Sequence, residues 1–227
     1  FRDRHYAQAH RVIVQTQEGA DWYLQRLGLR NLAVIPNGIT LPDANREPVI
    51  EVDSVVPRDA QVLLHVGRLA EPKSPEAVIA AFAEGLGSDP NWHCVVIGEG
   101  PKRPLIAEAI ARTGLGARLH LIGEAGNLGG WHKRAAVAVS ASRFEGFPNV
   151  LLEAMAHGVV CVAWNCKTEP AEIIREGENG FLVPVGDTHL LAQRLKALAD
   201  DTALRHRLAE AAQRVTDEFS DTRFFAA

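Results

Sequence analysis

Cysteine is scarce in this sequence. The 227 residues include three cysteines, Cys94, Cys161 and Cys166, and an odd number cannot form a closed disulfide framework. All three lie inside or beside apolar runs, which favours a reducing compartment, the cytoplasm. Cys161 and Cys166 are close enough in sequence to raise the question of a metal site, but no second ligand pair has a zinc-binding spacing. We therefore expect neither a metal ion nor another cofactor.

An excess of positive charge is also missing. The formal net charge is −4, whereas a nucleic-acid partner would require a strongly basic face. No run of about 18 apolar residues occurs, so we expect no membrane-spanning segment. The chain begins at Phe1 rather than Met and has no signal-like stretch, which suggests a piece of a longer protein.

Short apolar runs rich in β-branched residues alternate with helical patterns along most of the chain. This alternation is typical of a parallel sheet with crossover helices. The runs are nearly continuously apolar, so both faces of the sheet should be covered. The predicted fold class is α/β, a Rossmann-like doubly wound parallel sheet. Its strands are expected at residues 62–66, 94–98, 119–123, 137–141, 160–164 and 181–185.

The helical patterns often open with proline and close on glycine, as helix ends do. They cover residues 75–86, 104–114, 148–158, 170–180, 187–200 and 201–219. Asp187 and Asp201 are the expected N-caps of the last two. The glycine-rich stretch "GNLGG" at 126–130 reads as a flexible loop.

The first 45 residues have a different pattern. They form a short β-α-β stretch that ends in the turn "PNG" and a linker rich in proline and charge. Such a piece is too small to hold a core of its own. We expect residues 1–45 to be the end of a preceding domain, and residues 46–227 to be the main domain with its C-terminal helices.

The loops after the strands are the places to look for a ligand, because open parallel sheets bind at their carboxyl ends. Arg68 and Lys73 follow the first strand and could converge on one phosphate, although they could also be solvated loop cations. The turn "GEGP" at 98–101 lacks the third glycine of a dinucleotide fingerprint, so a tight turn is the better interpretation. Gly123 could let the backbone approach a flat base or could serve only as a turn.

The stretch "FEGFPNVLLEAMAHG" at 144–158 contains two carboxylates in an apolar setting. An ionised carboxylate among apolar neighbours costs several kcal/mol unless something pairs with it. Glu145 and Glu153 could accept hydrogen bonds from hydroxyls on either side of a phosphate, as the layout of a nucleoside diphosphate sugar would require. The alternative is that Glu153 pairs with a buried arginine such as Arg143.

The same stretch predicts an anion site at a helix start. Pro148 is the expected first helical residue, so the backbone N–H groups of Asn149, Val150 and Leu151 should point back, unpaired, toward the strand end. About half a positive charge is associated with such a start.

With these motifs assembled, the chain resembles the carboxyl-terminal half of the GT-B glycosyltransferases, specifically the retaining family 4. The resemblance rests on G-R-L-x-x-x-K at 67–73, on the E-x7-E pair from Glu145 to Glu153, and on "LLEAMAHG", "ENGFLVPVGD" and "VIPNGI". The sequence departs from the usual pattern at Ser74 and Glu169, where glycine is common, and at Val160, where proline is common.

The resemblance implies a role for each matching residue. Arg68 and Lys73 would hold the donor diphosphate in place of a metal ion, and with Glu145, which would contact the sugar hydroxyls, they form the expected catalytic group. Glu153 would bind the ribose hydroxyls. The other expected donor-binding residues are Gly67 in the first loop, Gly98, Gly100, Ile122 and Gly123 around the base, and Gly146, Phe147, Asn149 and Val150 along the sugar and phosphates.

The function expected from the resemblance is that of the donor-binding domain of a retaining glycosyltransferase. It would take a hexose or N-acetylhexosamine from a UDP-linked sugar, and a missing first domain would bind a polysaccharide or lipid-linked acceptor. The full-length protein would lie in the cytoplasm or at the inner membrane face, and this chain alone would transfer poorly. The alternative is a non-catalytic nucleotide-binding or regulatory domain, while a dinucleotide-dependent oxidoreductase is disfavoured by the broken glycine fingerprint.

Overall fold

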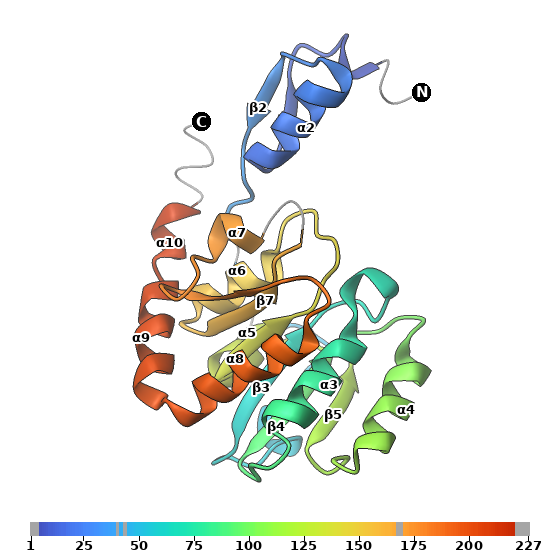
Figure 1. The fold of residues 1–227 in the computed structure, drawn as a ribbon, viewed down its shortest axis with the longest axis vertical. Helices are drawn as coiled ribbons and strands as arrows, with labels where there is room; N and C mark the ends of the chain where they lie inside the picture. Colours follow the sequence, from blue (N-terminus) through green and yellow to red (C-terminus); the bar gives the residue numbers. More distant parts are fainter. Residues whose placement is uncertain (1–4, 40, 43–44, 167–169, 221–227) are drawn as a thin grey trace.

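The main body is a six-stranded parallel sheet with helices on both faces (Figure 1). The computed structural model describes residues 5–39, 41–42, 45–166 and 170–220. The strands are β3 (Gln61–Val66), β4 (Trp92–Ile97), β5 (Leu119–Gly123), β6 (Val137–Ser140), β7 (Val160–Trp164) and β8 (Gly180–Val183). All six predicted strands are found, and their ends differ from the prediction by no more than two residues.

The strand order is β5-β4-β3-β6-β7-β8. The chain moves outward from β3 to β5, then crosses back to lay β6 beside the other edge of β3, where Leu63 pairs with Val137. This reversal is the topological switch point of a doubly wound sheet, and ligands bind at the carboxyl ends of the two strands that flank it. The predicted fold class is confirmed.

Each face of the sheet is covered by a different set of helices. The helices α3 (Pro75–Gly85), α4 (Arg103–Thr113) and α8 (Thr188–Asp200) cover one face. The helices α5 (Leu128–Arg134) and α6 (Asn149–Ala156) cover the other, with Trp131 fully buried against β3 and β4. Every residue of β4 is buried, as expected of a strand covered on both sides.

The C-terminal helices close the edge of the sheet. Asp187 caps α8 by accepting from the Leu190 backbone N–H at 2.8 Å, and Asp201 caps α9 (Thr202–Ala212) by accepting from Leu204 at 2.8 Å. Both predicted caps are confirmed. A turn separates α9 from a further short helix, α10 (Val215–Glu218), so the pattern over 201–219 is two helices rather than one.

The prediction of a loop at 126–130 was wrong, because α5 begins at Leu128. Asn127 is buried and bonds both backbone groups of Ile50, accepting from its N–H at 3.1 Å and donating to its carbonyl at 3.0 Å. Trp131 and His132 are then drawn into the core. Tertiary packing overrides the low helix propensity of Gly129 and Gly130.

The helix expected over 170–180 is a single turn, α7 (Pro170–Ile173). The buried Asn179 side chain ends it, since its oxygen accepts from the Arg175 N–H at 2.6 Å and its amide donates to the Ile173 carbonyl at 3.0 Å. Glu169, one of the departures noted in the sequence, lies outside the described residues.

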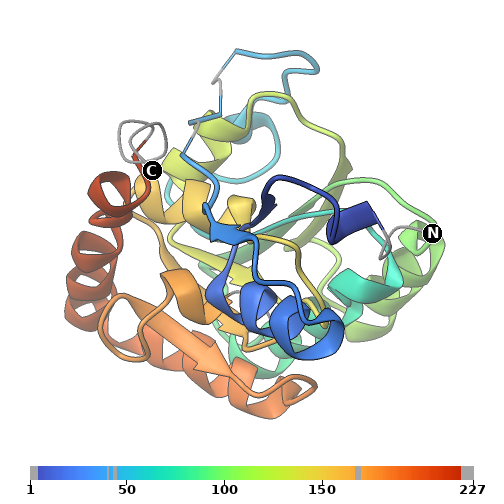
Figure 2. The same ribbon diagram turned by 90° about the horizontal axis from the view of Figure 1, so that it is seen from above.

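The N-terminal unit stands apart from the main body in Figure 1, and Figure 2 views it from above. It consists of β1 (Val12–Val14), α2 (Gln17–Leu27) and β2 (Leu32–Val34), with the two strands paired in parallel. Hydrogen bonds link residues 35–39, which follow β2, to the main body. The Ile39 N–H donates to the Phe219 carbonyl at 2.9 Å, and the Asn37 amide donates to the Asn149 side chain at 3.0 Å.

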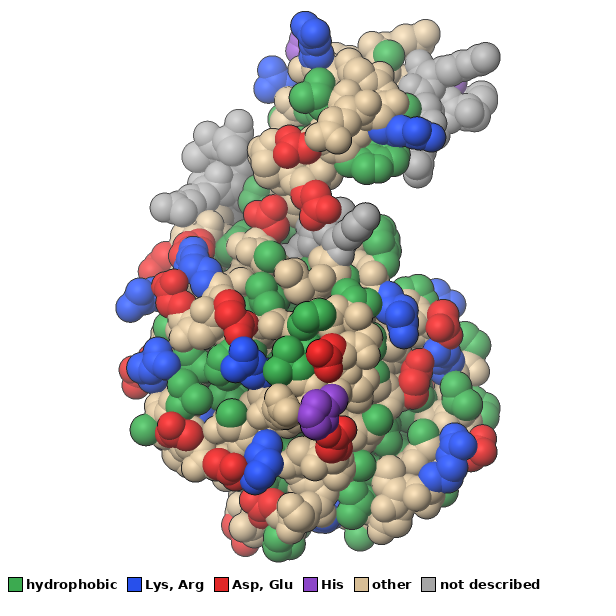
Figure 3. All heavy atoms as spheres, viewed as in Figure 1, with side chains coloured by type: hydrophobic (Ala, Val, Ile, Leu, Met, Phe, Trp, Pro, Cys, Tyr) green, Lys and Arg blue, Asp and Glu red, His purple; other side chains and the backbone are tan. Residues whose placement is uncertain are grey.

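The face seen in Figure 3 carries interspersed acidic and basic side chains, without a continuous basic stripe. Within the described part of the chain, no helix combines the length and apolar character needed to cross a membrane.

We predict that the protein loses stability as the pH falls from about 7.5 to 5.5. Burial lowers the pKa of His65 and of His93 from the ordinary value of 6.5. Below pH 6.5 the unfolded chain therefore takes up protons that the folded protein does not, and the free energy of unfolding falls until the lower folded pKa is reached. Urea unfolding across this range measures the slope.

Replacing His65 with Phe should reduce that slope even if it destabilises the protein at every pH. Leu63→Ala offers the control, since it truncates a buried apolar side chain of the same strand without removing an ionisable group and should leave the slope unchanged. A wild-type unfolding energy that stays constant over this range would contradict the prediction.

Candidate functional site

The site begins where the loops after β3 and β6 meet at the switch point. The first loop contains a short 3-10 helix, Glu71–Lys73, and leads into α3. The Arg143 N–H in the second loop donates to the Pro72 carbonyl at 2.7 Å, and the Arg143 side chain donates to the Ser74 hydroxyl at 3.2 Å. These bonds hold the two loops together.

Lys73 and Glu145 form an ion pair across this junction. The Lys73 Nζ lies 2.5 Å from both oxygens of the Glu145 carboxylate. The exposed fractions of the two side chains are 29% and 12%. Water screens such a pair less than a surface pair, so the attraction is stronger here.

The pair lines a small cavity of about 190 Å³. Its wall includes the hydroxyls of Ser140 and Ser142, the buried ring of Phe147, and the residues Asn149 and Val150 at the start of α6. The cavity therefore presents one ammonium, one carboxylate and several hydrogen-bonding groups within a partly enclosed space.

The helix start at this cavity differs from the prediction. Pro148 is the N-cap of α6 and Asn149 the first helical residue. The Asn149 N–H donates to the Phe147 carbonyl at 2.9 Å, and the Leu151 N–H donates to the Pro148 carbonyl at 3.0 Å. Among the described residues, only the N–H of Val150 in this group has no such bond, because the proline turn engages the other two locally.

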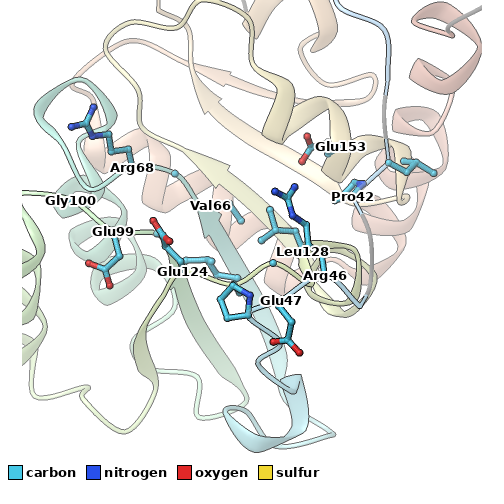
Figure 4. A pocket seen from close by; sticks show the side chains of 17 residues that line it. Pro42, Arg46, Glu47, Val66, Arg68, Glu99, Gly100, Glu124, Leu128 and Glu153 are labelled. Atoms are coloured by element: carbon cyan, nitrogen blue, oxygen red, sulfur yellow. The ribbon is translucent and has the colours of Figure 1, made fainter.

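A larger cavity of about 1080 Å³ adjoins the small one, and Val66 at the end of β3 contributes to the walls of both. Figure 4 shows Arg68 and Glu153 on different sides of this larger cavity. Gly67, Gly98 and Gly100 also line it. Arg68 and Lys73 therefore face two adjoining cavities, while Arg68 is exposed and has no ion pair among the described residues.

Glu153 faces the larger cavity, and its side chain is 23% exposed. Arg143, the alternative partner considered from the sequence, lies over the Trp164 ring at 5.5 Å and bonds Ser74 instead. No lysine or arginine in the described part of the chain pairs with Glu153. The nearest basic group is the His132 ring, whose Nε2 is 3.7 Å from the carboxylate, which is beyond hydrogen-bonding distance.

The glycines after β4 have a packing role. A side chain on Gly98, whose φ is +142°, would place its Cβ 2.0 Å from the Gly67 carbonyl oxygen, and one on Gly100 would lie 2.4 Å from that of Leu69. The loops after β3 and β4 can lie this close only without those side chains. This agrees with the interpretation of "GEGP" as a tight turn.

Three predicted residues lie outside the walls of these two cavities. Ile122 and Gly123 end β5, and Gly123 has a φ of +81°. Neither is among the residues that line the two cavities. Gly146 lines a third cavity of about 790 Å³ between its loop and the N-terminal unit, together with the exposed Phe144.

Several polar residues of the site were not predicted from the sequence. Ser140, Ser142 and His132 line the small cavity, and Glu99 and Glu124 line the larger one. Glu99 and Glu124 each follow a glycine at or directly after the end of a strand, and this position could have suggested them. No signal in the sequence indicated His132, because no helix was predicted over residues 128–134.

No group of three or more potential ligand side chains within the described residues is placed to bind a metal ion. Burial raises the pKa of the Cys94 thiol to about 12 and raises that of Cys161 further, so both are unreactive thiols packed in the core.

Comparison with known proteins decides the family. Residues 48–215 match the model described as "Glycosyl transferases group 1". The chain belongs to this family. The resemblance to the C-terminal half of GT-B glycosyltransferases of family 4 is thereby confirmed. The four charged residues of the site, Arg68, Lys73, Glu145 and Glu153, lie within the matched residues.

Two curated relatives align over most of the chain. It is 34% identical over 212 residues to an exopolysaccharide phosphotransferase of Streptomyces coelicolor, covering 92% of this chain and 22% of that protein. It is 27% identical over 207 residues to the amylovoran biosynthesis glycosyltransferase AmsD of Erwinia amylovora, covering 91% and 57%. The chain thus spans only part of the length of both relatives.

Solved structures share the fold. The pneumococcal O-GlcNAc transferase GtfA, solved with UDP and GlcNAc, matches with a TM-score of 0.83 and 20% identity over 99% of this chain and 45% of its own. Anabaena HepE, solved with UDP, matches with a TM-score of 0.84 and 23% identity over 97% and 63%. This chain therefore has the fold of about half of each structure.

Ser74 provides a test of the loop that carries Lys73. It is the only non-glycine residue with a positive φ in the described part of the chain, at 41°. A left-handed conformation costs a residue with a Cβ about 1–2 kcal/mol. We predict that Ser74→Gly is more stable than Ser74→Ala, with a free energy of unfolding about 1 kcal/mol higher. Both variants lose the hydroxyl, and glycine adopts the positive φ without strain.

Chemical denaturation of both variants measures the difference. The same pair of substitutions at Glu108, which is exposed within α4, should give the opposite order, with alanine more stable than glycine. Finding alanine more stable at both positions would contradict the strain assigned to Ser74.

Proposed function

We propose that this chain is the donor-binding domain of a retaining glycosyltransferase that uses a nucleotide sugar. The observation that carries the proposal is the meeting of Lys73, Glu145, Arg68 and Glu153 at two adjoining cavities on the switch point of the sheet. A bound nucleoside diphosphate sugar needs cations for the phosphates and acceptors for hydroxyls on both sides of them. The two cavities supply both.

Arg68 and Lys73 would bind the diphosphate and stabilise the negative charge that grows on it as the sugar departs. In the free protein Lys73 is paired with Glu145. Donor binding would therefore break this ion pair. The ammonium would turn to a phosphate oxygen, and the carboxylate would accept from sugar hydroxyls. The Val150 N–H and the Ser140 and Ser142 hydroxyls would supply further hydrogen bonds in the small cavity.

Glu153 would accept hydrogen bonds from the ribose hydroxyls in the larger cavity. Gly67, Gly98 and Gly100 would let the nucleotide lie close to the backbone there, and Ile122 and Gly123 would lie beyond them toward the base. Gly146, Phe147 and Asn149 would contact the sugar and phosphates.

A UDP-linked hexose or N-acetylhexosamine is the proposed donor. GtfA and HepE, which share the fold, were solved with UDP. The name of AmsD refers to amylovoran biosynthesis and that of the Streptomyces coelicolor relative to exopolysaccharide. Both names support a polysaccharide acceptor. A lipid-linked acceptor, and a place in the cytoplasm or at the inner membrane face, are proposed from the family resemblance alone.

Residues 1–45 are proposed to be the end of an acceptor-binding domain and the linker that leaves it. The unit of β1, α2 and β2 exposes Ile13 and Trp22 to 63% and 53%. Leu24 and Val34 of the same small unit are also exposed. Several large apolar side chains gathered on one exposed surface indicate that another part of the protein covers it. Residues 46–227 would then bind the donor, and the acceptor and full transfer activity would require the rest of that first domain.

Isothermal titration of the chain with UDP, ADP and GDP tests donor binding directly. We expect UDP to bind in the micromolar to millimolar range and the other two nucleotides more weakly. If none binds at millimolar concentration, the proposed donor site is wrong. If ADP or GDP binds better than UDP, the site is correct but the base has been misassigned.

Replacing Arg68 or Lys73 with Ala should weaken UDP binding about tenfold to a hundredfold and change uridine binding by less than about threefold. A hydrogen bond to a charged group contributes about 1.5–3 kcal/mol, and about 1.4 kcal/mol corresponds to a factor of ten. The same titration calorimetry measures both ligands.

Arg58→Ala is the matched control. Arg58 is 86% exposed and precedes β3 at the opposite edge of the sheet, where it pairs with Asp53. It should leave UDP binding unchanged. Equal losses for UDP and uridine in the Arg68 and Lys73 variants would contradict the phosphate assignment.

A further inference from the structure

His132 is buried beside the small cavity without a hydrogen bond. Its side chain is 0% exposed, and neither ring nitrogen has a partner among the described residues. A buried polar group left unpaired costs about 1–3 kcal/mol. Nearly all such groups in folded proteins are paired, so an exception calls for a reason.

The surroundings of the ring indicate that reason. His132 lines the small cavity that contains the Lys73–Glu145 pair. On the other side, its Nε2 lies 3.7 Å from a carboxylate oxygen of Glu153, which faces the larger cavity. The distance from the ring nitrogen to this proposed nucleotide-binding carboxylate therefore exceeds a hydrogen-bond length by less than about 1 Å.

Packing holds the ring in this place. His132 stacks on His157, with ring centroids 5.4 Å apart and planes inclined by 25°. The His157 ring bonds in turn to the Glu153 backbone carbonyl at 2.8 Å, since its Nδ1 must donate to that acceptor. Both rings thus lie beside the helical turn that carries Glu153, and the 3.7 Å separation from His132 is only about 0.5 Å longer than a hydrogen bond.

We propose that His132 is a positioning residue that holds the Glu153 carboxylate for a vicinal diol of the ligand, the ribose of a nucleotide. This inference rests on the proposed function. A carboxylate has two oxygens and about four lone pairs, so it can accept from two hydroxyls and from one imidazole N–H at once. The N–H of His132 fixes the direction of the carboxylate, and the buried position of the ring keeps water from replacing it.

The proposal predicts selectivity for ribonucleotides that depends on His132. Wild-type protein should bind UDP about tenfold more tightly than 2′,3′-dideoxy-UDP. His132→Phe retains the ring stacking and removes the N–H, so it should weaken UDP binding about fivefold to tenfold and dideoxy-UDP binding by less than about twofold. His132→Gln retains an N–H near the Nε2 position and should bind UDP within about threefold of wild type.

Titration calorimetry of the full chain with both nucleotides measures these ratios, and thermal unfolding checks that each variant folds. A second set in the Glu153→Ala background isolates the carboxylate. There, His132→Phe should cause no further loss, because the group that His132 positions is absent. Equal losses for both nucleotides in His132→Phe, or no loss at all, would overturn the inference.

The outcomes separate this inference from the proposed function. A wild-type protein that binds no UDP would overturn both. A wild-type protein that prefers UDP to its dideoxy form, with the same preference in His132→Phe, would leave the donor site intact and overturn only the role of His132.

Discussion

The pairing of β6 with β3 is the constraint on which the rest of this structure depends. Two residue pairs, Leu63 with Val137 and Leu64 with Ala138, bring the second half of the sheet against the first. Their side chains are buried on opposite faces, so a shift of register by one residue would turn each toward the wrong helices. The loops that carry Lys73 and Glu145 follow these two strands and meet only because of this pairing.

The resulting site contains few charged groups, and one of its cations is already paired. Lys73 is neutralised by Glu145 in the free protein, while Arg68 remains exposed and Glu153 faces a cavity with no arginine or lysine partner in the described residues. An ion pair that is already formed limits the cost of keeping charges in a partly enclosed cavity. A ligand with both phosphates and hydroxyls can exchange this pair for contacts of the same kind.

Prediction from the sequence succeeded where local patterns are strong. The six strands are continuous apolar runs, and the caps Asp187 and Asp201 precede clear helical patterns. It failed at α5, where the bonds between Asn127 and Ile50 join residues 77 positions apart. It also misplaced the start of α6, because the turn at Pro148 engages N–H groups that a simple helix start would leave unpaired.

The sequence by itself determined the fold class, the family and the identity of the charged residues that follow the strands, since these depend on periodicity and on motifs within short stretches. Only the tertiary structure decided the partners. Lys73 binds Glu145, 72 residues away, and Arg143 bonds Ser74 rather than Glu153. His132 lies beside Glu153 without a hydrogen bond. These contacts join residues that are far apart in the sequence, because crossover helices return distant segments to one edge of the sheet. No local sequence pattern encodes which segments meet there.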